Sequence, residues 1–298
     1  MVNLYDNVLS QAQHYRQLSC GKCLITVYNC PLENKHQDIW SHHNYFVYVV
    51  EGRKIWHTPD GSYDLREGSC VLVRKGACIV EQFFDVTFCL VMFFVPDEFI
   101  CDVLKSRSSP VHGSARDFKS LITVQSSAAL KAFYQSMMPH FESSRQPDTS
   151  LLNLKFRELI LTIADNPSNA EILSYFSALL NAPRSVSLQA VMEENCCFNL
   201  KLDEYARLSS RSLSAFKRDF IKQYNMPPGK WLLEKRLNHA LHLLTTQNRT
   251  VAEAAFESGF ESASHFSRAF RERFGKSPAS FKNQSPVNDH LQLTAHPS

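Results

Sequence analysis

The stretch ESASHFSRAFRERFGKSPASF (residues 261–281) decides how the last third of this 298-residue chain folds. Phe266, Phe270 and Phe274 recur at every fourth residue, which on an α-helix places them on one face. Ser262 precedes them, and its hydroxyl can accept a hydrogen bond from a backbone N–H of the first turn. The stretch therefore predicts an amphipathic helix after Ser262, whose polar face carries Ser264, Ser267, Arg268 and Arg271.

A shorter helix is predicted just before this one. Thr250 and Glu253 have the spacing of a capping box, in which the two side chains satisfy backbone N–H groups at a helix start. Ala254 and Ala255 allow close contact between helices, and Gly259 can adopt the left-handed conformation that ends a helix. A short helix, a tight turn and a longer helix in this order are typical of a helix-turn-helix.

The same unit occurs twice in the chain. An offset of 50 residues, without a gap, aligns Ser212, Ser214, Phe216, Arg218, Phe220 and Pro228 with Ser262, Ser264, Phe266, Arg268, Phe270 and Pro278. Conservative matches extend the alignment, with Asp203 over Glu253, Tyr224 over Phe274 and Trp231 over Phe281. The pattern indicates one supersecondary unit present in two copies.

The first copy has the layout of a recognition helix. Leu213, Phe216 and Phe220 lie on one side. Ser214, Lys217 and Arg218 share the other side at helical spacing. The major groove of DNA admits one helix, Arg and Lys suit the O6 and N7 atoms of guanine, and Ser can donate or accept. We therefore expect base contacts from these three polar residues.

Further basic residues could neutralise DNA phosphates, which would fix the register and make the affinity depend on salt. A solvated surface charge is the alternative for each one. The candidates are Lys222, Lys230, Arg236, Arg271 and Lys276.

The segment between the two copies, residues 231–244, contains no Gly or Pro and predicts a continuous helix. At ~1.5 Å per residue this helix could hold the two units roughly 20 Å or more apart. Two recognition helices about one duplex turn apart, ~34 Å, could enter adjacent major grooves.

Charge is distributed unevenly along the chain. Residues 184–282 carry 16 Lys and Arg against 10 Asp and Glu, whereas the remainder carries 16 against 19. A basic segment joined to a mildly acidic one favours a polyanion-binding module attached to a module with another task. The length is about twice that of a typical domain, which agrees with several packed units.

The first hundred residues predict β-structure. Their strand-like stretches are rich in Val, Phe, Tyr and Ile and are separated by turn signals at residues 51–52, 59–61 and 67–68. Closely spaced strands of this kind favour a small barrel or sandwich. The stretches are CLITVYNC (23–30), YFVYVVEGRKIWH (45–57), SCVLVRKGACIVEQFF (69–84) and VTFCLVMFFV (86–95).

Helical patterns follow at residues 127–140, 151–164 and 170–180. Helix breaks are expected at Pro139, Pro147 and Pro167. The second helix carries an apolar stripe that belongs either to the core or to half of a dimer interface. The stripe consists of Leu151, Leu154, Leu159 and Ile163.

Several classes of protein are excluded by the sequence. No apolar run approaches the ~20 residues of a membrane span, and the N-terminus lacks the layout of a signal peptide, so we expect a cytoplasmic protein. The nine cysteines are odd in number and lie mainly in strand-like stretches, which predicts reduced thiols. Cys20 and Cys23 have metal-ligand spacing, but no second pair follows, and no metal is expected there.

The C-terminal third resembles the DNA-binding domain of the AraC/XylS family of transcription regulators. The resemblance spans about Ser187 to Lys282 and is densest at VAEAA (251–255), GF (259–260), HFSRAFRERFG (265–275) and SP (277–278). It implies base contacts from Ser214, Lys217 and Arg218 in the first unit and from Ala263, Ser264, Ser267 and Arg268 in the second.

Two positions depart from the family pattern. Ala263 can touch only a thymine methyl group. Ser209 aligns with Gly259, where a turn glycine is common, and a left-handed serine costs about 1 kcal/mol.

The resemblance also implies a cupin-like barrel and a helical dimerisation segment before the DNA-binding domain. The stretches Tyr45–Gly52 and Leu65–Gly68 are similar to family members that include regulators of type III secretion. In that branch the partner of the barrel can be a protein and not a small molecule.

A ligand pocket inside the barrel is a further expectation. Its candidate residues, mainly aromatic, are Trp40, His42, Tyr45, Tyr48 and Trp56. The alternative for aromatic residues at strand spacing, and the more common one, is that they belong to the core. A metal site is not expected, although His36, His42, His43 and His57 are potential ligands. The His-x-His and later Glu spacing of metal-binding cupins is absent, and His42 and His43 are adjacent and so alternate strand faces.

The sequence thus predicts an α+β multidomain chain. We expect a cupin-like sensing barrel (1–110), a helical linker and dimerisation segment (111–183), an all-α DNA-binding domain with two helix-turn-helix units (184–284) and a frayed tail (285–298). The expected function is that of a sequence-specific transcription regulator, with an activator favoured, that acts without a cofactor and without catalysis.

The expected partners are double-stranded DNA, a second copy of the chain, RNA polymerase, and an unknown effector that is either a small molecule or a regulatory protein. No membrane contact is expected. The alternative from another class is a cupin-type metalloenzyme with an appended helical domain.

Overall fold

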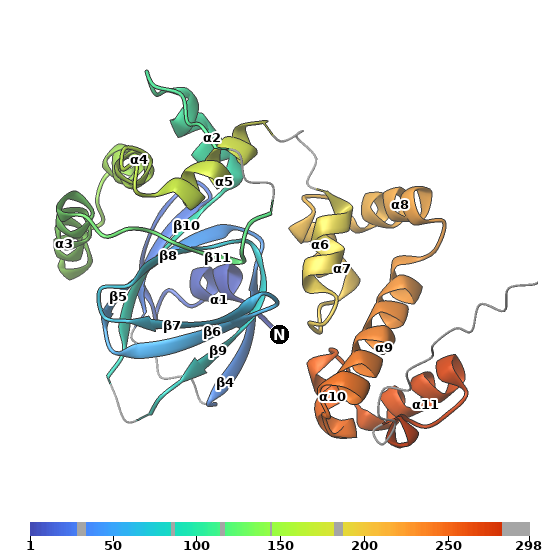
Figure 1. The fold of residues 1–298 in the computed structure, drawn as a ribbon. Coiled ribbons are helices and arrows are strands. Elements are labelled where there is room, and N and C mark those ends of the chain that lie inside the picture. Colours follow the sequence, from blue (N-terminus) through green and yellow to red (C-terminus); the bar gives the residue numbers. More distant parts are fainter. Residues whose placement is uncertain (29–33, 85–86, 114–116, 144, 182–186, 282–298) are drawn as a thin grey trace, which may run out of the picture. The chain divides into compact units, whose positions relative to one another are not determined.

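The computed structural model describes the chain except for residues 29–33, 85–86, 114–116, 144, 182–186 and 282–298. The chain forms two compact units (Figure 1). The first comprises Met1–Asn195 and Asp203–Leu213, and the second comprises Cys196–Leu202 and the residues from Ser214 onward.

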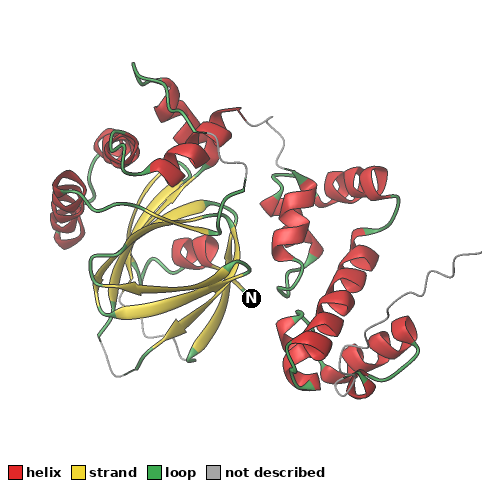
Figure 2. Cartoon of the chain, viewed as in Figure 1, coloured by secondary structure: helices red, strands yellow, loops and turns green. Residues whose placement is uncertain are grey.

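Two β-sheets form the centre of the first unit (Figure 2). The five-stranded sheet has the order β1 (Val2–Asn3), β4 (His36–Ser41), β9 (Gly76–Gln82), β6 (Arg53–Thr58) and β7 (Gly61–Arg66). The six-stranded sheet has the order β11 (Leu121–Thr123), β8 (Cys70–Val73), β5 (Asn44–Glu51), β10 (Cys89–Val95), β3 (Cys23–Tyr28) and β2 (Arg16–Cys20).

Side chains alternate between two cores along the strands of the six-stranded sheet. On β10, Leu90 and Met92 belong to the core between the sheets, whereas Val91 and Phe93 belong to the core under the helices. This is the period of two that a pleated strand imposes. The inner core also takes side chains from α1 (Leu4–Ser10), including the fully buried Val8. The predicted β-barrel architecture is confirmed.

Helices cover the outer face of the six-stranded sheet. They are α2 (Asp97–Lys105), α3 (Ala128–Glu142), α4 (Thr149–Ala164) and α5 (Ala170–Asn181). Phe93 of β10 meets Phe133 of α3 and Phe156 of α4, at ring-centroid distances of 5.6 and 6.0 Å. The three predicted helices are therefore confirmed to within two residues at each end.

Two details of these helices differ from expectation. Pro139 does not break α3, which continues to Glu142, and the N–H of Ser143 donates to the Pro139 carbonyl. A proline this close to the end of a helix disturbs little of the remaining hydrogen bonding. On α4, Leu159 and Ile163 are buried, but Leu151 and Leu154 are 39% and 61% exposed, so the predicted stripe is divided between core and surface.

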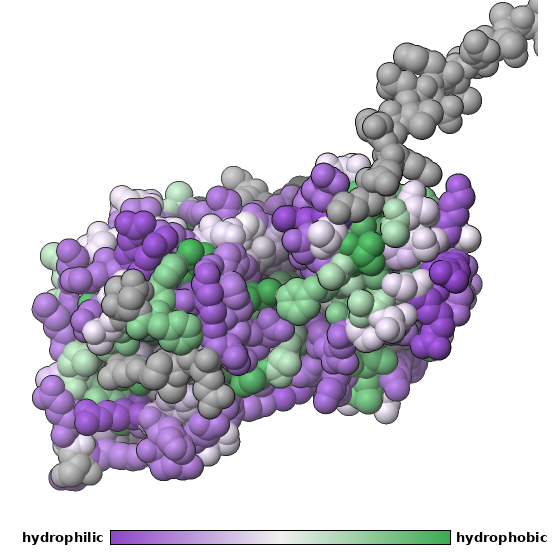
Figure 3. Space-filling model, turned by 90° about the horizontal axis from the view of Figure 1, so that it is seen from below, coloured by the Kyte–Doolittle hydropathy of each residue, from purple (hydrophilic) through white to green (hydrophobic). Residues whose placement is uncertain are grey.

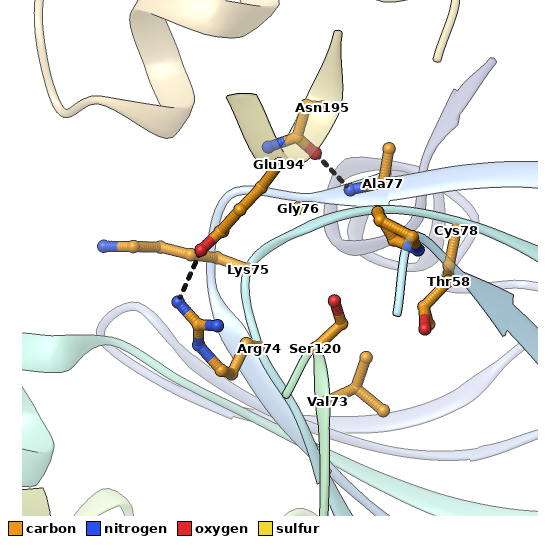
Figure 4. A pocket seen from close by; sticks show the side chains of 11 residues that line it. Thr58, Val73, Arg74, Lys75, Gly76, Ala77, Cys78, Ser120, Glu194 and Asn195 are labelled. Atoms are coloured by element: carbon orange, nitrogen blue, oxygen red, sulfur yellow. Dashed lines mark hydrogen bonds and ion pairs between the residues drawn. The ribbon is translucent and has the colours of Figure 1, made fainter. Parts of the chain in front are cut away.

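The helices α6 (Leu188–Asn195) and α7 (Leu202–Leu208) lie mainly in the first unit. Figure 4 shows the end of α6 at the β8–β9 corner, where the N–H of Ala77 donates to Asn195 Oδ1 at 2.9 Å. Arg74 Nη2 contacts Glu194 Oε1 at 3.3 Å in the same place. The compact unit therefore extends past the predicted boundary near residue 184, which itself lies outside the described residues.

The second unit is built around one long helix, α9 (Pro228–Thr246). Figure 1 shows α8 (Leu213–Tyr224) at one end of α9, and α10 (Val251–Glu257) and α11 (Ala263–Phe274) at the other end. Phe220 of α8 packs on Trp231 of α9 at 5.9 Å between ring centroids. At ~1.5 Å per residue, the 19 residues of α9 span roughly 28 Å. The predicted spacer helix is therefore confirmed and is longer than expected.

Hydrophilic side chains predominate on the face of the molecule shown in Figure 3. None of the described helices is both long enough and apolar enough to cross a membrane.

Candidate nucleic-acid interface

The second helix-turn-helix has the local structure that its sequence predicts. Thr250 and Glu253 form the capping box of α10, with Thr250 N–H to Glu253 Oε2 at 2.7 Å and Glu253 N–H to Thr250 Oγ1 at 3.2 Å. Ser262 caps α11 by accepting from the His265 N–H at 3.4 Å. Both helix starts are therefore fixed by side chains within the unit.

The turn between α10 and α11 requires glycine. Gly259 has a φ of +80°, in the left-handed region, and a Cβ there would lie 2.6 Å from the Cys197 carbonyl oxygen. The Phe260 N–H donates to the Ala255 carbonyl, which closes the end of α10. Gly259 thus permits both the turn and the close approach of the 196–202 segment.

In the turn between α7 and α8, a serine adopts the left-handed conformation that Gly259 adopts in the second unit. Ser210, and not Ser209, has the positive φ, at 56°. The Arg211 N–H donates to the Ala206 carbonyl at 2.9 Å, so Ser210 is the counterpart of Gly259. The alignment at a constant offset of 50 therefore shifts by one residue in the turn, because four residues separate α7 from α8 and five separate α10 from α11.

On α11, apolar and polar faces separate as predicted. Phe266 and Phe270 are fully buried, and Phe274 packs on Phe270 at 4.5 Å between centroids. Ala263, Ser264 and Arg268 are exposed, and Ser267 is half-buried. Within the described part of the chain, Arg268 forms no ion pair, so its guanidinium is available to a ligand.

On α8, the fully buried Phe216 and Phe220 oppose the exposed Ser214, Lys217 and Arg218. Leu213, which was predicted on the apolar side, is 38% exposed because it is the first residue of the helix. Arg218 Nη2 lies 3.0 Å from Asp219 Oδ1, and the Arg218 side chain is largely exposed. An exposed pair between adjacent residues is weak, so a stronger anion can displace it.

The five predicted phosphate contacts fall into two groups. Lys222, Lys230, Arg271 and Lys276 are exposed. Arg236 is half-buried, and its Nε and Nη2 donate to the carbonyls of Cys196 and Phe198, both at 2.7 Å. Its guanidinium therefore holds the segment before α7 against α9.

The 196–202 segment was not predicted to have a role, since its sequence has no motif. It packs in the second unit, where Arg236 holds its carbonyls and Asn199 donates to Glu261 of the second turn. The sequence identifies Arg236 as a basic residue, but it does not identify the carbonyls that Arg236 binds, because every residue has a carbonyl group.

The structure does not bring the five predicted ligand-pocket residues together. Tyr45 and Trp56 face the core between the sheets, whereas Tyr48 faces the helices and stacks on Tyr134 at 4.1 Å. Trp40 and His42 lie near Arg207 of α7. Strand alternation explains the separation, since Tyr45 and Tyr48 are an odd number of residues apart.

A small cavity does exist between the sheets. It has a volume of about 30 Å³ and is lined by Leu4, Tyr28, Ile39, Lys54, Trp56, Val80, Leu90 and Met92. Lys54 is buried there, with Nζ 4.3 Å from the centroid of the Phe88 ring. This volume suits about one water molecule and is well below that of a typical ligand site.

His42 and His43 do not form a metal site with other described residues. Their rings contact each other at 4.2 Å between centroids. Burial, with further contributions from His43 and Arg207, lowers the pKa of His42 to about 4. The imidazole is therefore neutral at pH 7.

Comparison with known proteins matches two parts of the chain to two families. Residues 44–175 match the family described as the ExsA N-terminal regulatory domain, and residues 205–284 match a helix-turn-helix domain family. The virulence regulon transcriptional activator VirF of Yersinia enterocolitica is 30% identical over 234 residues, which cover 78% of this chain and 86% of VirF. The thermoregulatory protein LcrF of Yersinia pestis has the same identity and coverage.

A third relative is the HTH-type transcriptional regulator ExsA of Pseudomonas aeruginosa, 25% identical over 256 residues, which cover 75% of this chain and 89% of ExsA. Among solved structures, fatty-acid-bound ToxT of Vibrio cholerae aligns over 89% of this chain and 96% of its own, with a TM-score of 0.37 and 13% identity.

The paired helix-turn-helix units and these matches define a DNA-binding transcription regulator. The alternative of a cupin-type metalloenzyme is wrong, because the proteins that match are regulators and not enzymes. The chain belongs to the AraC/XylS family of transcription regulators.

Proposed function

We propose that α8 and α11 are recognition helices that enter two adjacent major grooves and activate transcription from the bound site. The observation that carries this proposal is the shared design of the two helices. Each buries a pair of phenylalanines and exposes a polar, cationic face, and both are attached to the same helix α9. A helix that is amphipathic in this way can fill a groove without losing its core.

The proposed base contacts are those predicted from sequence. On α11, Arg268 is suited to bidentate contact with guanine, Ser264 and Ser267 can donate or accept, and Ala263 can touch a thymine methyl group. On α8, Ser214 and Lys217 would contact bases directly, and Arg218 would exchange its weak pair with Asp219 for the nucleic acid.

The four exposed basic residues Lys222, Lys230, Arg271 and Lys276 are proposed as phosphate contacts. Such contacts position a protein on the duplex without reading its sequence. For Arg236 we propose a positioning role, since two of its nitrogens already bind backbone carbonyls.

The first unit is proposed to be regulatory and to respond to a partner protein. A match to an N-terminal regulatory domain supports a regulatory role. A protein is favoured over a small molecule bound between the sheets, because the cavity there has a volume of only about 30 Å³. A partner that prefers one state of the first unit would change DNA affinity by binding linkage.

Two further partners complete the proposal. RNA polymerase is expected, because the relatives named activators act in transcription. A second copy of the chain is expected to pair through α4, where Leu151 and Leu154 are exposed.

The test of DNA reading is a footprint and an affinity titration on DNA upstream of the chain's own gene. Arg268→Ala should lose about 1–3 kcal/mol of discrimination at one guanine while the protein stays folded. Arg273→Ala is the matched control, since Arg273 is an exposed cation of the same helix outside the proposed base-contact set. Unchanged sequence preference in Arg268→Ala, or equal loss in both variants, would refute the contact assignment.

The test of regulation is a reporter gene with a variant that fills the cavity. Val80 lines the cavity, and Val80→Leu adds one methylene group to it. Regulation should persist in this variant if the signal is a protein. Loss of the response with DNA binding intact would show that a small molecule occupies the cavity.

A further inference from the structure

A cluster of two histidines and one glutamate lies on three adjacent strands of the five-stranded sheet. His36 of β4 pairs directly with Glu81 of β9, and His57 lies on β6 at the other side of β9. His57 and Glu81 follow the inward-facing Trp56 and Val80, so they point away from the core between the sheets. The cluster therefore lies on the outer face of the sheet.

The potential ligand atoms of the cluster converge. His57 Nε2 is 3.0 Å from Glu81 Oε2, and His36 Nε2 is 3.8 Å from Glu81 Oε1. One ligand atom from each residue can be chosen so that all three lie within 4.8 Å of one another. Within the described part of the chain, no other set of three His, Cys, Asp or Glu side chains meets this condition.

The orientation of His57 is fixed by a second contact. Its Nδ1 lies 2.7 Å from Ser62 Oγ of β7, which leaves Nε2 directed at the cluster. Histidines that bind metal ions commonly hold the second ring nitrogen in a hydrogen bond of this kind, which fixes the orientation of the ring. This contact is what distinguishes the cluster from two histidines that merely lie near a carboxylate.

We propose that His36, His57 and Glu81 bind one divalent transition-metal ion, for which Zn²⁺ is the best match. Imidazole nitrogen and carboxylate oxygen are both good zinc ligands, with bonds of about 2.0–2.2 Å. The ligand atoms of a tetrahedral zinc ion are roughly 3.3–3.5 Å apart, so the three atoms of the cluster, which lie within 4.8 Å of one another, need only small side-chain rotations to reach this spacing. Water would occupy the fourth position, because the site faces solvent.

Lys35 occupies part of this site in the structure. Its Nζ is 3.1 Å from Glu81 Oε1, and its side chain is largely exposed, so it can move into solvent when an ion binds. Lys35 is therefore a competitor for the carboxylate, and its removal should strengthen metal binding. An increase in metal affinity after removal of Lys35 is expected only if the ion binds the Glu81 carboxylate.

The site would connect three strands of the regulatory unit. An ion that binds the folded protein and not the unfolded chain stabilises the fold by mass action. The proposal is independent of DNA reading, since none of its residues belongs to the second unit.

The experiment is isothermal titration of the untagged, metal-free full chain with ZnCl₂. We expect one equivalent of Zn²⁺, and a weakening of at least about tenfold in His57→Gln and in Glu81→Gln. Lys35→Ala should bind more tightly than the wild type, and Ser62→Ala more weakly. His14→Gln is the matched control, because His14 is an exposed histidine outside the cluster.

Two further measurements separate metal binding from folding and from thiols. Circular dichroism should show the same fold for all variants in EDTA. Zn²⁺ should raise the Tm of the wild type, of His14→Gln and of Lys35→Ala, should raise that of Ser62→Ala less, and should leave that of His57→Gln and Glu81→Gln nearly unchanged. The Co²⁺ form should absorb without sulfur-to-cobalt charge transfer. Absence of Zn²⁺ binding, equal binding by wild type and His57→Gln, or a thiolate spectrum would each overturn the proposal.

Discussion

Ser210 and Gly259 occupy equivalent positions in the two turns but differ in their surroundings. Both have a positive φ, which costs a side chain about 1–2 kcal/mol and costs glycine nothing. Ser210 is exposed, whereas Gly259 is buried against the Cys197 carbonyl. The serine therefore stores strain that no packing requires.

Ser210→Gly should stabilise the protein. The relief of left-handed strain exceeds the greater backbone entropy of glycine in the unfolded chain by about 0.5 kcal/mol. Chemical denaturation of the full chain measures the change as a higher midpoint at constant slope. The change Gly259→Ala serves as the contrast, since it must destabilise by more than this amount because its Cβ would meet backbone. Destabilisation in Ser210→Gly would contradict the strain argument.

His42 makes the first unit sensitive to acid. Its pKa is about 4, below the ordinary value near 6.5, mainly because it is buried and next because His43 and the cations Arg207 and Lys22 are close, with Asp6 acting in the opposite direction. The unfolded chain therefore takes up the proton first as the pH falls. Stability from the neutral imidazole is complete above about pH 6.5 and is lost progressively towards pH 4.

His42→Gln should reduce this acid sensitivity. The glutamine does not titrate, so the Tm should fall less between pH 7 and pH 5 than in the wild type. Thermal unfolding at the two pH values, with His14→Gln as the control for an exposed histidine, provides the measurement. Equal falls in wild type and His42→Gln would show that other groups carry the acid response.

At the scale of single elements, the exposed start of α9 offers a test of phosphate contact. Lys230 lies in the first turn of α9 and is exposed. Lys230→Ala should weaken binding to specific and non-specific DNA alike, and should reduce the slope of log K against log salt by about 1. Titrations at several salt concentrations give this slope. If the slope is unchanged, Lys230 makes no phosphate contact.

The helices of the second unit could be predicted because each buries one face, which leaves a periodic apolar pattern in the sequence. Phe266 and Phe270 mark that face by spacing alone, and the Thr250 capping box marks a helix start. The candidate recognition residues followed from the same spacing, since the polar face must lie opposite. Arg236 could not be assigned in this way, because its partners are backbone carbonyls from a segment without a motif.

Five strands escaped prediction. Two of them, β1 (Val2–Asn3) and β11 (Leu121–Thr123), have only two and three residues, too few for a pattern. β2 (RQLSC), β4 (HQDIWS) and β7 (GSYDLR) carry mostly polar residues, because each has a face or an edge towards solvent. Only the strands with two buried faces, such as β10, have the continuous apolar sequence that signals a strand without context. His36 and His57 were identified from the sequence as potential metal ligands, but Glu81 was not, because the three side chains come from β4, β9 and β6 and only the sheet register brings them together.

At the scale of the whole molecule, α7 is part of the helix-turn-helix match and also part of the first compact unit. The helix-turn-helix family match begins at residue 205, yet residues 203–213 pack with the first unit. Arg207 Nη1 contacts Asp6 Oδ2 of α1 at 2.8 Å, and the Arg207 guanidinium lies over the Trp40 ring at 5.2 Å. The helix α7 is therefore the part of the matched helix-turn-helix domain that packs with the β-sheets of the first unit.

The proposed pairing of two chains would bring two such domains together. Leu154 is 61% exposed and Leu151 39% exposed on α4, and the opposite face of α4 is fixed in the core by Phe156 and Ile160. Exposed leucines on a rigid helix are suited to pairing with the same face of a second copy. A charge on this face would be desolvated in the dimer without a partner, which is costly.

The double change Leu151→Glu and Leu154→Glu should convert a dimer to a monomer while the fold is retained. Light scattering after size exclusion gives the mass of each variant, and circular dichroism checks the fold. Leu9→Glu is the matched control, because Leu9 is a leucine of α1 that is 47% exposed. The monomer should also bind a pair of half-sites with lower affinity than the wild type and a single half-site equally well. A double variant that remains dimeric would place the interface elsewhere on the chain.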